Sequence, residues 1–412
     1  MTRARRPPAR RIGMALAGGG PLGAIYEIGA LCALDEAIDG LDLADCDAYV
    51  GVSAGGFLAA GLANGISPRE LCSAFIENEG EAQDLFDPSV LMRPALGEFA
   101  QRLAMLPALA GQAAWRLLVE RRSLLAAAER LGRALPTGLF SNRMVDVQLR
   151  RLFSVAGRSN DFRELDRTLV LVATDLDSGR SAPFGRPGWD HVPISTAVQA
   201  SSALPGLFPP VEIGGHFYVD GALKKTLHAS VLLEEGLDLL ICLNPLVPFD
   251  ASRSPRHRVL SSGDEQIPRL VDGGLPVVLS QTFRTLIHSR LELGMKGYER
   301  SHPGTDILLF EPDQRDPEMF LANTFSYSQR RWLAEHAYQR TRELLRSRRS
   351  VLGAQLARHG LALNDAILDD RHRRLLRRPA HRCAPPLHTQ AAMAAKRLEE
   401  VLNDLEQALQ AA

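Results

Sequence analysis

The segment 14-MALAGGGPLGAIYEIGAL-31 passes from a short apolar run through three consecutive glycines and a proline into an amphipathic stretch. Gly18, Gly20 and Gly23 fit the pattern G-x-G-x-x-G, in which backbone amides at the start of a helix hold an anion. The order of apolar run, tight turn and helical spacing predicts a strand over 12–17 and a helix over 21–38. The pattern alone leaves open whether this turn binds a nucleotide, another anion or no ligand.

The same order of strand, tight turn and helix returns at 46-CDAYVGVSAGGFLAAGLANG-65. Here the turn reads 51-GVSAG-55, the G-x-S-x-G pattern that places a serine at a sharp strand-to-helix turn. Such a turn lifts the Ser53 hydroxyl above the sheet edge, and the small residues Gly51 and Gly55 let a substrate approach. Ser53 is therefore a candidate nucleophile, although a serine at this place also suits a plain helix N-cap.

The two turns together favour an oxyanion over a nucleotide. A dinucleotide fold needs an Asp or Glu at the end of its second strand, about 20 residues after the glycines. The acids in that interval lie in the polar loop 39-DGLDLAD-45, and the second strand leads to Ser53 instead. Neighbouring parallel strands end at the same edge of a sheet, about 4.8 Å apart. We therefore expect the amides of Gly18, Gly19 and Gly20 to lie beside Ser53 and to stabilise a tetrahedral oxyanion.

A nucleophilic serine needs a base, and the sequence offers an aspartate for this role. Eleven histidines are present, but none stands in a strand-end setting that marks it. Asp220 does, in 216-HFYVDGALKK-225, where Gly221 follows it. An aspartate at its ordinary pKa is a weak base for a hydroxyl, so we expect an apolar, desolvated site to raise the pKa of Asp220. Taken alone, this Asp–Gly pair would also suit an ordinary turn.

These residues resemble the motifs of one family, the patatin-like phospholipases. GGGPLG at 18–23 is similar to the oxyanion-hole motif of that family, and GVSAG at 51–55 is similar to its nucleophile elbow. DGA at 220–222 is similar to the motif that carries the second member of a Ser–Asp dyad. The resemblance implies that Ser53 and Asp220 hydrolyse acyl esters in lipids without a histidine.

Further segments extend the resemblance. 173-ATDLDSG-179 and 200-ASSALPGLFPPV-211 are similar to family segments, and the second is expected to pack near the site. The resemblance covers about residues 12–245 and continues more weakly to about residue 310. It departs from the family at Leu22, where many members carry Arg or Lys, which removes a charged contact and leaves the backbone donors intact.

Short apolar runs that alternate with helical stretches predict the fold class. Further strands are expected at 168-TLVLVATDL-176, 216-HFYVDG-221 and 238-DLLICLNP-245, with a weaker one at 307-ILLF-310. Such alternation favours a mostly parallel sheet covered on both faces. The prediction is an α/β fold, a three-layer α/β/α sandwich with a mostly parallel central sheet, plus a C-terminal helical extension.

The chain is predicted to divide into three parts. A disordered basic tail over 1–11 precedes a patatin-like catalytic domain over 12–325. The motif-bearing core of that domain spans 12–245, and a helical insertion within it spans about 68–150. A helical C-terminal region follows over 326–412.

Composition and charge narrow the class of protein. Lys and Arg number 48, and so do Asp and Glu, so no net charge recruits nucleic acid. The five cysteines are scattered without a C-x-x-C pair, which fits a reducing compartment and argues against a zinc site. No apolar run is long enough to predict a transmembrane segment. No metal or cofactor pattern appears, so we expect neither.

The basic start of the chain, followed by an apolar run, has the outline of a signal peptide. Cleavage there would remove the glycine turn, so an uncleaved, cytoplasmic chain is expected, at most peripheral to a membrane. Its expected partner is a lipid substrate, reached in solution or at a membrane surface, and the sequence leaves the oligomeric state open.

Two other functions stay open. An esterase of the α/β-hydrolase type would use a Ser–His–Asp triad, with a histidine such as His288 or His302 close to Ser53. A catalytically silent lipid-binding or scaffold protein would need no nucleophile. Reaction with a fluorophosphonate probe separates the second of these from an enzyme.

Overall fold

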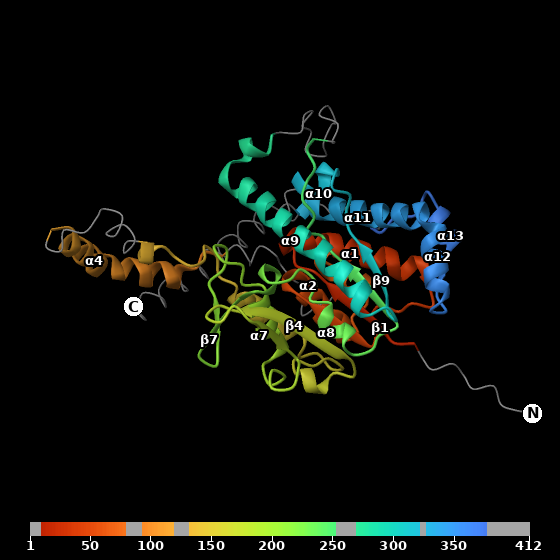
Figure 1. Cartoon of the computed structure of the whole chain (residues 1–412), viewed down its shortest axis with the longest axis horizontal. Coiled ribbons are helices and arrows are strands. Elements are labelled where there is room, and N and C mark those ends of the chain that lie inside the picture. Colours follow the sequence, from red (N-terminus) through yellow and green to blue (C-terminus); the bar gives the residue numbers. More distant parts are fainter. Residues whose placement is uncertain (1–9, 80–92, 119–131, 253–268, 322–326, 377–412) are drawn as a thin grey trace, which may run out of the picture.

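A mixed β-sheet forms the centre of the protein in the computed structural model, which describes residues 10–79, 93–118, 132–252, 269–321 and 327–376 (Figure 1). Five strands run parallel in the order β9-β8-β1-β3-β4: β1 (Ile12–Leu16), β3 (Ala48–Gly51), β4 (Thr168–Asp175), β8 (Leu239–Leu243) and β9 (Asp306–Phe310). Three further strands extend the sheet beyond β4 in antiparallel pairings: β5 (Ser181–Phe184), β6 (Val211–Ile213) and β7 (His216–Asp220).

Helices cover both faces of this sheet. One face carries α1 (Gly20–Ala37), α2 (Ser53–Ala63), α3 (Pro68–Cys72), α7 (Ile194–Ser201) and α11 (Tyr327–Ser347). The other face carries α8 (Ser230–Leu233) and the long helix α9 (Gly274–Ser301). The predicted three-layer α/β/α sandwich with a mostly parallel sheet is therefore confirmed.

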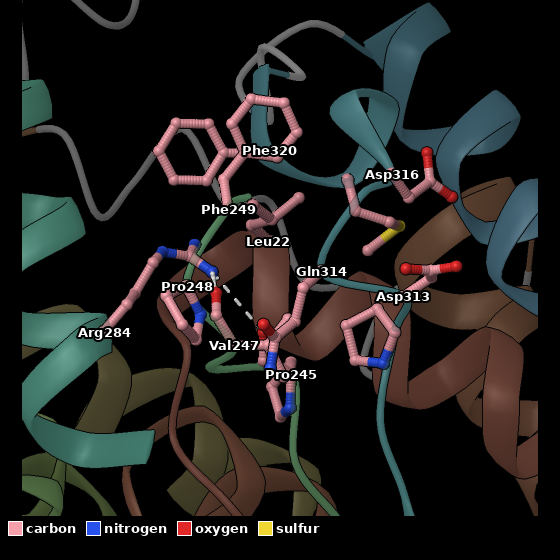
Figure 2. Close-up of a pocket in the computed structure, with 12 residues that line it drawn as sticks. Leu22, Pro245, Val247, Pro248, Phe249, Arg284, Asp313, Gln314, Asp316 and Phe320 are labelled. Atoms are coloured by element: carbon pink, nitrogen blue, oxygen red, sulfur yellow. Dashed lines mark hydrogen bonds between the residues drawn. The ribbon is translucent and has the colours of Figure 1, made fainter. Parts of the chain in front are cut away.

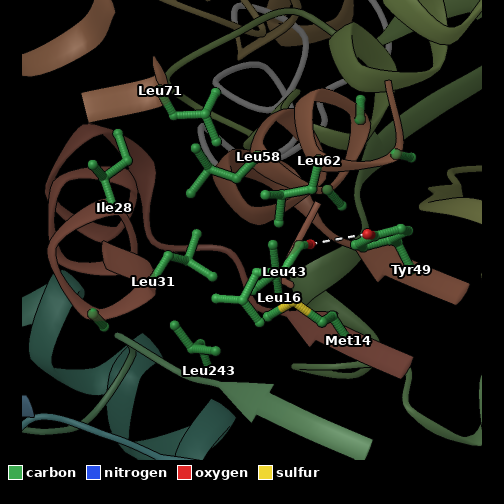
Figure 3. Close-up of a cluster of buried hydrophobic side chains, with 14 of the residues drawn as sticks. Met14, Leu16, Ile28, Leu31, Leu43, Tyr49, Leu58, Leu62, Leu71 and Leu243 are labelled. Atoms are coloured by element: carbon green, nitrogen blue, oxygen red, sulfur yellow. Dashed lines mark hydrogen bonds between the residues drawn. The ribbon is translucent and has the colours of Figure 1, made fainter. Parts of the chain in front are cut away.

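The alternation of side chains along each strand explains the two layers. Met14 and Leu16 of β1 point to the core beneath α1 and α2, whereas Ala15 and Ala17 face the opposite side. Figure 3 shows the first core, in which leucines of α1 and α2 close over the strands. Within it, the hydroxyl of Tyr49 donates to the carbonyl of Leu43 at 2.9 Å, so the one polar atom of this ring is satisfied.

The strands predicted from apolar runs are all present, whereas β5 and β6 had no prediction. Both are short strands of the antiparallel part of the sheet, and short alternating strands give a weaker sequence signal than buried parallel strands.

The segment predicted as a helical insertion is only partly helical. Its described elements are α3, the π-helix η1 (Ser73–Glu77), α4 (Leu96–Leu118), the short 3-10 helix η3 (Gly132–Ala134) and α6 (Arg143–Leu152). Residues 135–142 are extended or turn, in contrast to the prediction, because Gly138 pairs with Gly206 in an isolated bridge. Another element of the segment, α4, projects away from the sheet in Figure 1. Residues 80–92 and 119–131 lie outside the described residues.

The C-terminal part of the described chain packs against α1. Helix α11 packs against α1 so closely that a Cβ atom on Gly29 would lie 2.4 Å from the carbonyl oxygen of Ala334. The other described elements here are α10 (Pro317–Leu321), α12 (Arg349–Ala357), α13 (Asp365–Asp369) and β10 (Ala362–Leu363), which pairs with β2 (Ile38–Asp39). Most of the predicted N-terminal tail, residues 1–9, and residues 377–412 of the predicted helical region lie outside the described residues.

Among the helices that the structure describes, none combines the length and the hydropathy needed to span a bilayer.

Candidate active site

The register of the sheet brings the predicted motifs together. Leu16 at the end of β1 pairs with Gly51 at the end of β3, and Gly51 pairs with Leu171 of β4. β7 runs antiparallel to β4, and its last residue, Asp220, pairs with Ala173. The glycine turn after β1, the serine turn after β3 and the end of β7 therefore meet at one edge of the sheet.

Ser53 is the first residue of α2 and stands in a strained turn. Its φ is +53°, in the left-handed region that residues other than glycine seldom adopt. The backbone N–H of Ser53 donates to Oγ of Ser201 at 2.8 Å, and Ser201 Oγ donates to the carbonyl of Val172 at 2.7 Å. Helix α7 and strand β4 thus hold the backbone of the turn.

Asp220 is buried directly beside Ser53. Its carboxylate accepts a hydrogen bond from the backbone N–H of Ala222 at 2.8 Å. Burial raises the pKa of Asp220 from its ordinary 3.8 to about 6, and the N–H of Ala222 and the nearby Ser53 side chain oppose that shift. The carboxylate is thus a stronger base than an exposed aspartate and lies beside the hydroxyl.

Gly18 brings the glycine turn against the same pair. A Cβ atom on Gly18 would lie 3.0 Å from Cβ and 3.6 Å from Oγ of Ser53. Helix α1 begins at Gly20, with Gly19 as its N-cap. Within the described part of the chain, the backbone amides of Gly18, Gly19 and Gly20 have no hydrogen-bond partner. These donors lie at the positive end of α1 and are available to a negative charge that forms next to Ser53.

The other motif glycines leave no room for a side chain. A Cβ atom would lie 2.3 Å from a backbone carbonyl oxygen at Gly55 and 2.1 Å from one at Gly221. At Gly51 it would lie 2.5 Å from a backbone Cα atom, and at Gly23 it would lie 3.0 Å from a proline ring. Close approach of neighbouring segments accounts for glycine at Gly51, Gly55 and Gly221, and the ring of Pro245 leaves little space at Gly23.

The region that contains this site matches a known family. A family model described as patatin-like phospholipase matches residues 14–233, more than half of the 412-residue chain. The chain belongs to the patatin-like phospholipase family. The match includes the glycine turn, Ser53 and Asp220, so the resemblance drawn from the motifs is confirmed.

Individual relatives of this patatin-like chain are distant. Uncharacterized NTE family proteins of Mycobacterium tuberculosis and Mycobacterium bovis are 33% identical over 75 residues, which is 18% of this chain and 19% of each relative. The chain therefore aligns with about a fifth of the length of these relatives.

Some solved structures resemble this chain, with low sequence identities and low TM-scores. VipD from Legionella pneumophila has 16% identity and a TM-score of 0.34, over 80% of this chain and 67% of that one. ExoU in its complex with SpcU, from the type III secretion system of Pseudomonas aeruginosa, has 22% identity and a TM-score of 0.26, over 70% and 52%. The family assignment rests on the family match alone.

No histidine of the described chain hydrogen-bonds to Ser53 or Asp220 in this patatin-like site. His228 lies near Asp220, because its Nε2 atom is 3.2 Å from the carbonyl oxygen of Gly221, the next residue in the chain. Burial lowers the pKa of His228 to about 4, so the ring is neutral at physiological pH. It contacts the backbone next to the carboxylate.

The two histidines considered for a triad have other partners. Nε2 of His288 lies 3.0 Å from the amide nitrogen of Gln314, and Nδ1 of His302 lies 2.8 Å from Oγ of Ser301. Neither makes the hydrogen bond to Ser53 that a Ser–His–Asp triad requires.

A pocket lies beside the glycine turn (Figure 2). Leu22 of the turn lines it together with Pro245, which follows β8, and with the guanidinium of Arg284 from α9. The guanidinium lies 5.4 Å from the centre of the Phe320 ring, and burial lowers the pKa of Arg284 to about 10. Leu22 is uncharged, and the positive charge at this pocket comes from Arg284 of α9.

Two of these residues were not predicted, namely Ser201 and Arg284. Ser201 lies in the segment 200–211 that was expected near the site, so a signal for its place existed but none for its hydrogen bond. Arg284 has no motif around it. Among the described residues, no three His, Cys, Asp or Glu side chains form a group that could hold a metal ion.

Proposed function

We propose that this chain is a serine acyl-ester hydrolase that acts on phospholipids, lysophospholipids or related acyl lipids. The observation that carries the proposal is the position of Ser53, held at positive φ, beside the buried carboxylate of Asp220, whose charged form the Ser53 side chain favours. Membership of the patatin-like phospholipase family supports a lipid as the substrate class.

Acylation follows from this geometry. Asp220 takes the proton of the Ser53 hydroxyl while Oγ attacks the carbonyl carbon of the ester. The negative charge moves to the carbonyl oxygen, where the free amides of Gly18, Gly19 and Gly20 stabilise it. Asp220 then returns the proton to the leaving alcohol, and the acyl group stays on Ser53.

Deacylation repeats the steps with water as the nucleophile. Asp220 takes a proton from water, the resulting hydroxide attacks the acyl-enzyme, and the same amides hold the second oxyanion. Collapse releases the fatty acid and returns the proton to Ser53. The raised pKa of Asp220 suits both roles, because the carboxylate is charged near neutral pH and yet binds a proton readily.

The proposal includes the cellular setting. We place the chain in the cytoplasm, at the periphery of a membrane, with residues 12–325 as its catalytic unit. Cell fractionation tests the first part. The activity of a chain truncated after residue 325 tests the second, with circular dichroism to check that the fold survives the loss of α11, which packs on α1.

A Ser–His–Asp esterase and a silent lipid-binding protein remain the alternatives. One experiment separates all three: wild type, Ser53→Ala, Asp220→Asn, His228→Ala and His288→Ala are treated with a fluorophosphonate probe and assayed for phospholipid hydrolysis. The dyad predicts that wild type is labelled, that Ser53→Ala is not, and that Asp220→Asn loses activity as Ser53→Ala does. A histidine variant as inactive as Asp220→Asn would favour the triad, and an unlabelled wild type would favour the silent protein.

A further inference from the structure

Helix α9 exposes a stripe of large apolar side chains. Leu275 is 69% exposed and Leu293 is 70% exposed, values that are high for leucine. Leu279, Phe283 and Leu286 lie between them and are exposed as well. Successive spacings of three, four or seven residues place all five on one side of the helix.

Basic residues continue this stripe toward the end of the helix. Lys296 and Arg300 are exposed and lie on the same side by the helical period. The acids of this half, Glu292 and Glu299, fall on the flank. We call the seven residues the α9 face: Leu275, Leu279, Phe283, Leu286, Leu293, Lys296 and Arg300.

Two arginines of α9 fix the helix to the two segments that border the site. Nη1 of Arg290 donates to the carbonyl of Leu223 at 2.9 Å, in the 3-10 helix η5 (Gly221–Leu223) that follows Asp220. Nη1 of Arg284 lies 3.4 Å from the carbonyl oxygen of Pro245, whose ring packs against the glycine turn. The α9 face is thus held in a constant position relative to Ser53.

We propose that the α9 face docks on an anionic lipid bilayer. The helix would lie in the plane of the interface, with its apolar side chains among the upper acyl segments and its two cations, Lys296 and Arg300, against lipid phosphates. The inference rests on the membrane setting of the proposed function and names the surface that docks, although docking itself needs no ester hydrolysis.

A second copy of the chain fits this face less well than a bilayer does. Antiparallel pairing of two α9 faces places the apolar half of each against the basic half of the other. Parallel pairing places Lys296 and Arg300 against the same cations of the partner. An anionic bilayer satisfies both halves at once, because its phosphates lie directly above its acyl chains.

The test measures sedimentation with vesicles, in the Ser53→Ala background so that lipid is not consumed. Vesicles of phosphatidylcholine are compared with vesicles that also contain phosphatidylglycerol. We expect binding to the anionic vesicles and a loss of about tenfold or more on Leu279→Asp combined with Leu286→Asp. Val351→Asp on α12 is the matched control, because Val351 is 61% exposed and lies outside the face, and it should bind as the parent does.

A second pair of substitutions tests the charges. Lys296→Glu combined with Arg300→Glu should weaken binding to the anionic vesicles by about fivefold or more for each charge and leave the weaker binding to phosphatidylcholine as it was. This pair keeps every apolar side chain, so it remains informative if the aspartate pair fails to fold.

Three results would overturn the inference. One is a parent chain that sediments with neither vesicle, and another is equal binding by the aspartate pair and Val351→Asp. The third is a dimer, detected by light scattering, that the aspartate pair dissociates while no variant binds vesicles. Turnover of a soluble short-chain ester by the chain with Ser53 is measured in parallel, so that failure of the proposed function appears as absent turnover with vesicle binding intact.

Discussion

The backbone N–H of Ser53 donates a hydrogen bond to the side-chain oxygen of Ser201 at 2.8 Å. The hydroxyl of Ser201 in turn donates to the carbonyl of Val172 in β4 at 2.7 Å. A second serine thus holds the strained turn of the first. Ser201 is buried and does not contact Asp220 by any hydrogen bond within the described residues, so it acts through the position of Ser53.

Ser201→Ala should therefore lower both stability and turnover. The substitution leaves the buried N–H of Ser53 without an acceptor, which costs about 1–3 kcal/mol. We expect a lower free energy of unfolding in urea, and a fall in kcat with little change in KM, because the turn relaxes while the substrate contacts stay. Ser202→Ala is the matched control, since Ser202 is its chain neighbour, and it should leave both quantities unchanged. Equal effects of the two substitutions would contradict the positioning role.

The pH profile of hydrolysis should report on Asp220. The carboxylate must be charged to accept the proton of Ser53, and its pKa lies at about 6. We expect kcat/KM for a soluble ester to rise as pH increases through about 6 and to be lost progressively below it. A profile that stays flat between pH 5 and pH 8, roughly one unit on either side of that value, would count against Asp220 as the base.

Asp220→Asn should stabilise the inactive chain at high pH. The pKa of Asp220 is higher in the folded state than its ordinary 3.8, so the folded chain holds this proton more tightly. The stabilisation that the proton on Asp220 gives the folded chain is complete below about pH 4 and is lost as pH rises through about 6. Above that, the buried charge costs up to about 3 kcal/mol, which the neutral asparagine avoids.

The check is the Tm of both proteins from pH 4 to pH 8, a range chosen from about two units below to about two units above the raised pKa. The asparagine variant should melt at the higher temperature near the upper end, and the difference should shrink as pH falls. A difference that grows toward low pH would have the wrong sign for a carboxylate with a raised pKa.

Gly19→Val should damage catalysis more than binding. A Cβ atom at this position would lie 2.8 Å from both Cα of Gly23 and Cγ of Pro245, so the turn must shift and its amides with it. Loss of one oxyanion donor typically lowers kcat by about 100- to 1,000-fold, whereas affinity for a lipid analogue should change little. Gly111→Ala on α4, where a Cβ meets no atom within 4 Å, is the control.

The same two proteins test the nucleotide hypothesis. Calorimetric titration with NAD or ATP should give no heat of binding with wild type. Micromolar nucleotide binding by wild type, together with full ester turnover by Gly19→Val, would refute the interpretation of the glycines as oxyanion donors.

Hydrolysis should not depend on calcium. The proposed oxyanion donors are backbone amides, and no metal takes part in the proposed steps. Excess chelator should leave turnover unchanged, and a loss that added calcium reverses would show that the mechanism is incomplete.

The sequence predicts most of the fold because the parallel strands are continuous apolar runs. Residues 168–175 and 239–243 have no polar face, so their strands can be found from composition alone. Residues 181–184 and 211–213 are short and mixed in polarity, and their pairing depends on β4 and β7, which lie elsewhere in the chain. Tertiary pairing of this kind leaves no periodic signal.

The residues of the candidate site also divide into those that the sequence predicts and those that it does not. Ser53 and the glycine turn can be predicted because each lies in a local pattern with a geometric meaning. The hydrogen bond from Ser53 to Ser201 cannot be predicted, since it depends on how α7 packs beside α2. Arg284 is a single cation on a helix with other cations, and only the pocket in Figure 2 distinguishes it.

On the proposed dyad, the position of Asp220 on β7 also determines when activity can arise during synthesis. A chain emerging from the ribosome carries the glycine turn and Ser53 early, but the strand with the carboxylate is made much later and pairs, among the described strands, with β4 and β6. Contacts between distant segments form late in folding. On the proposed dyad, a nascent chain therefore has no base to activate its serine, and the order of strands delays lipid cleavage until most of the protein has been made.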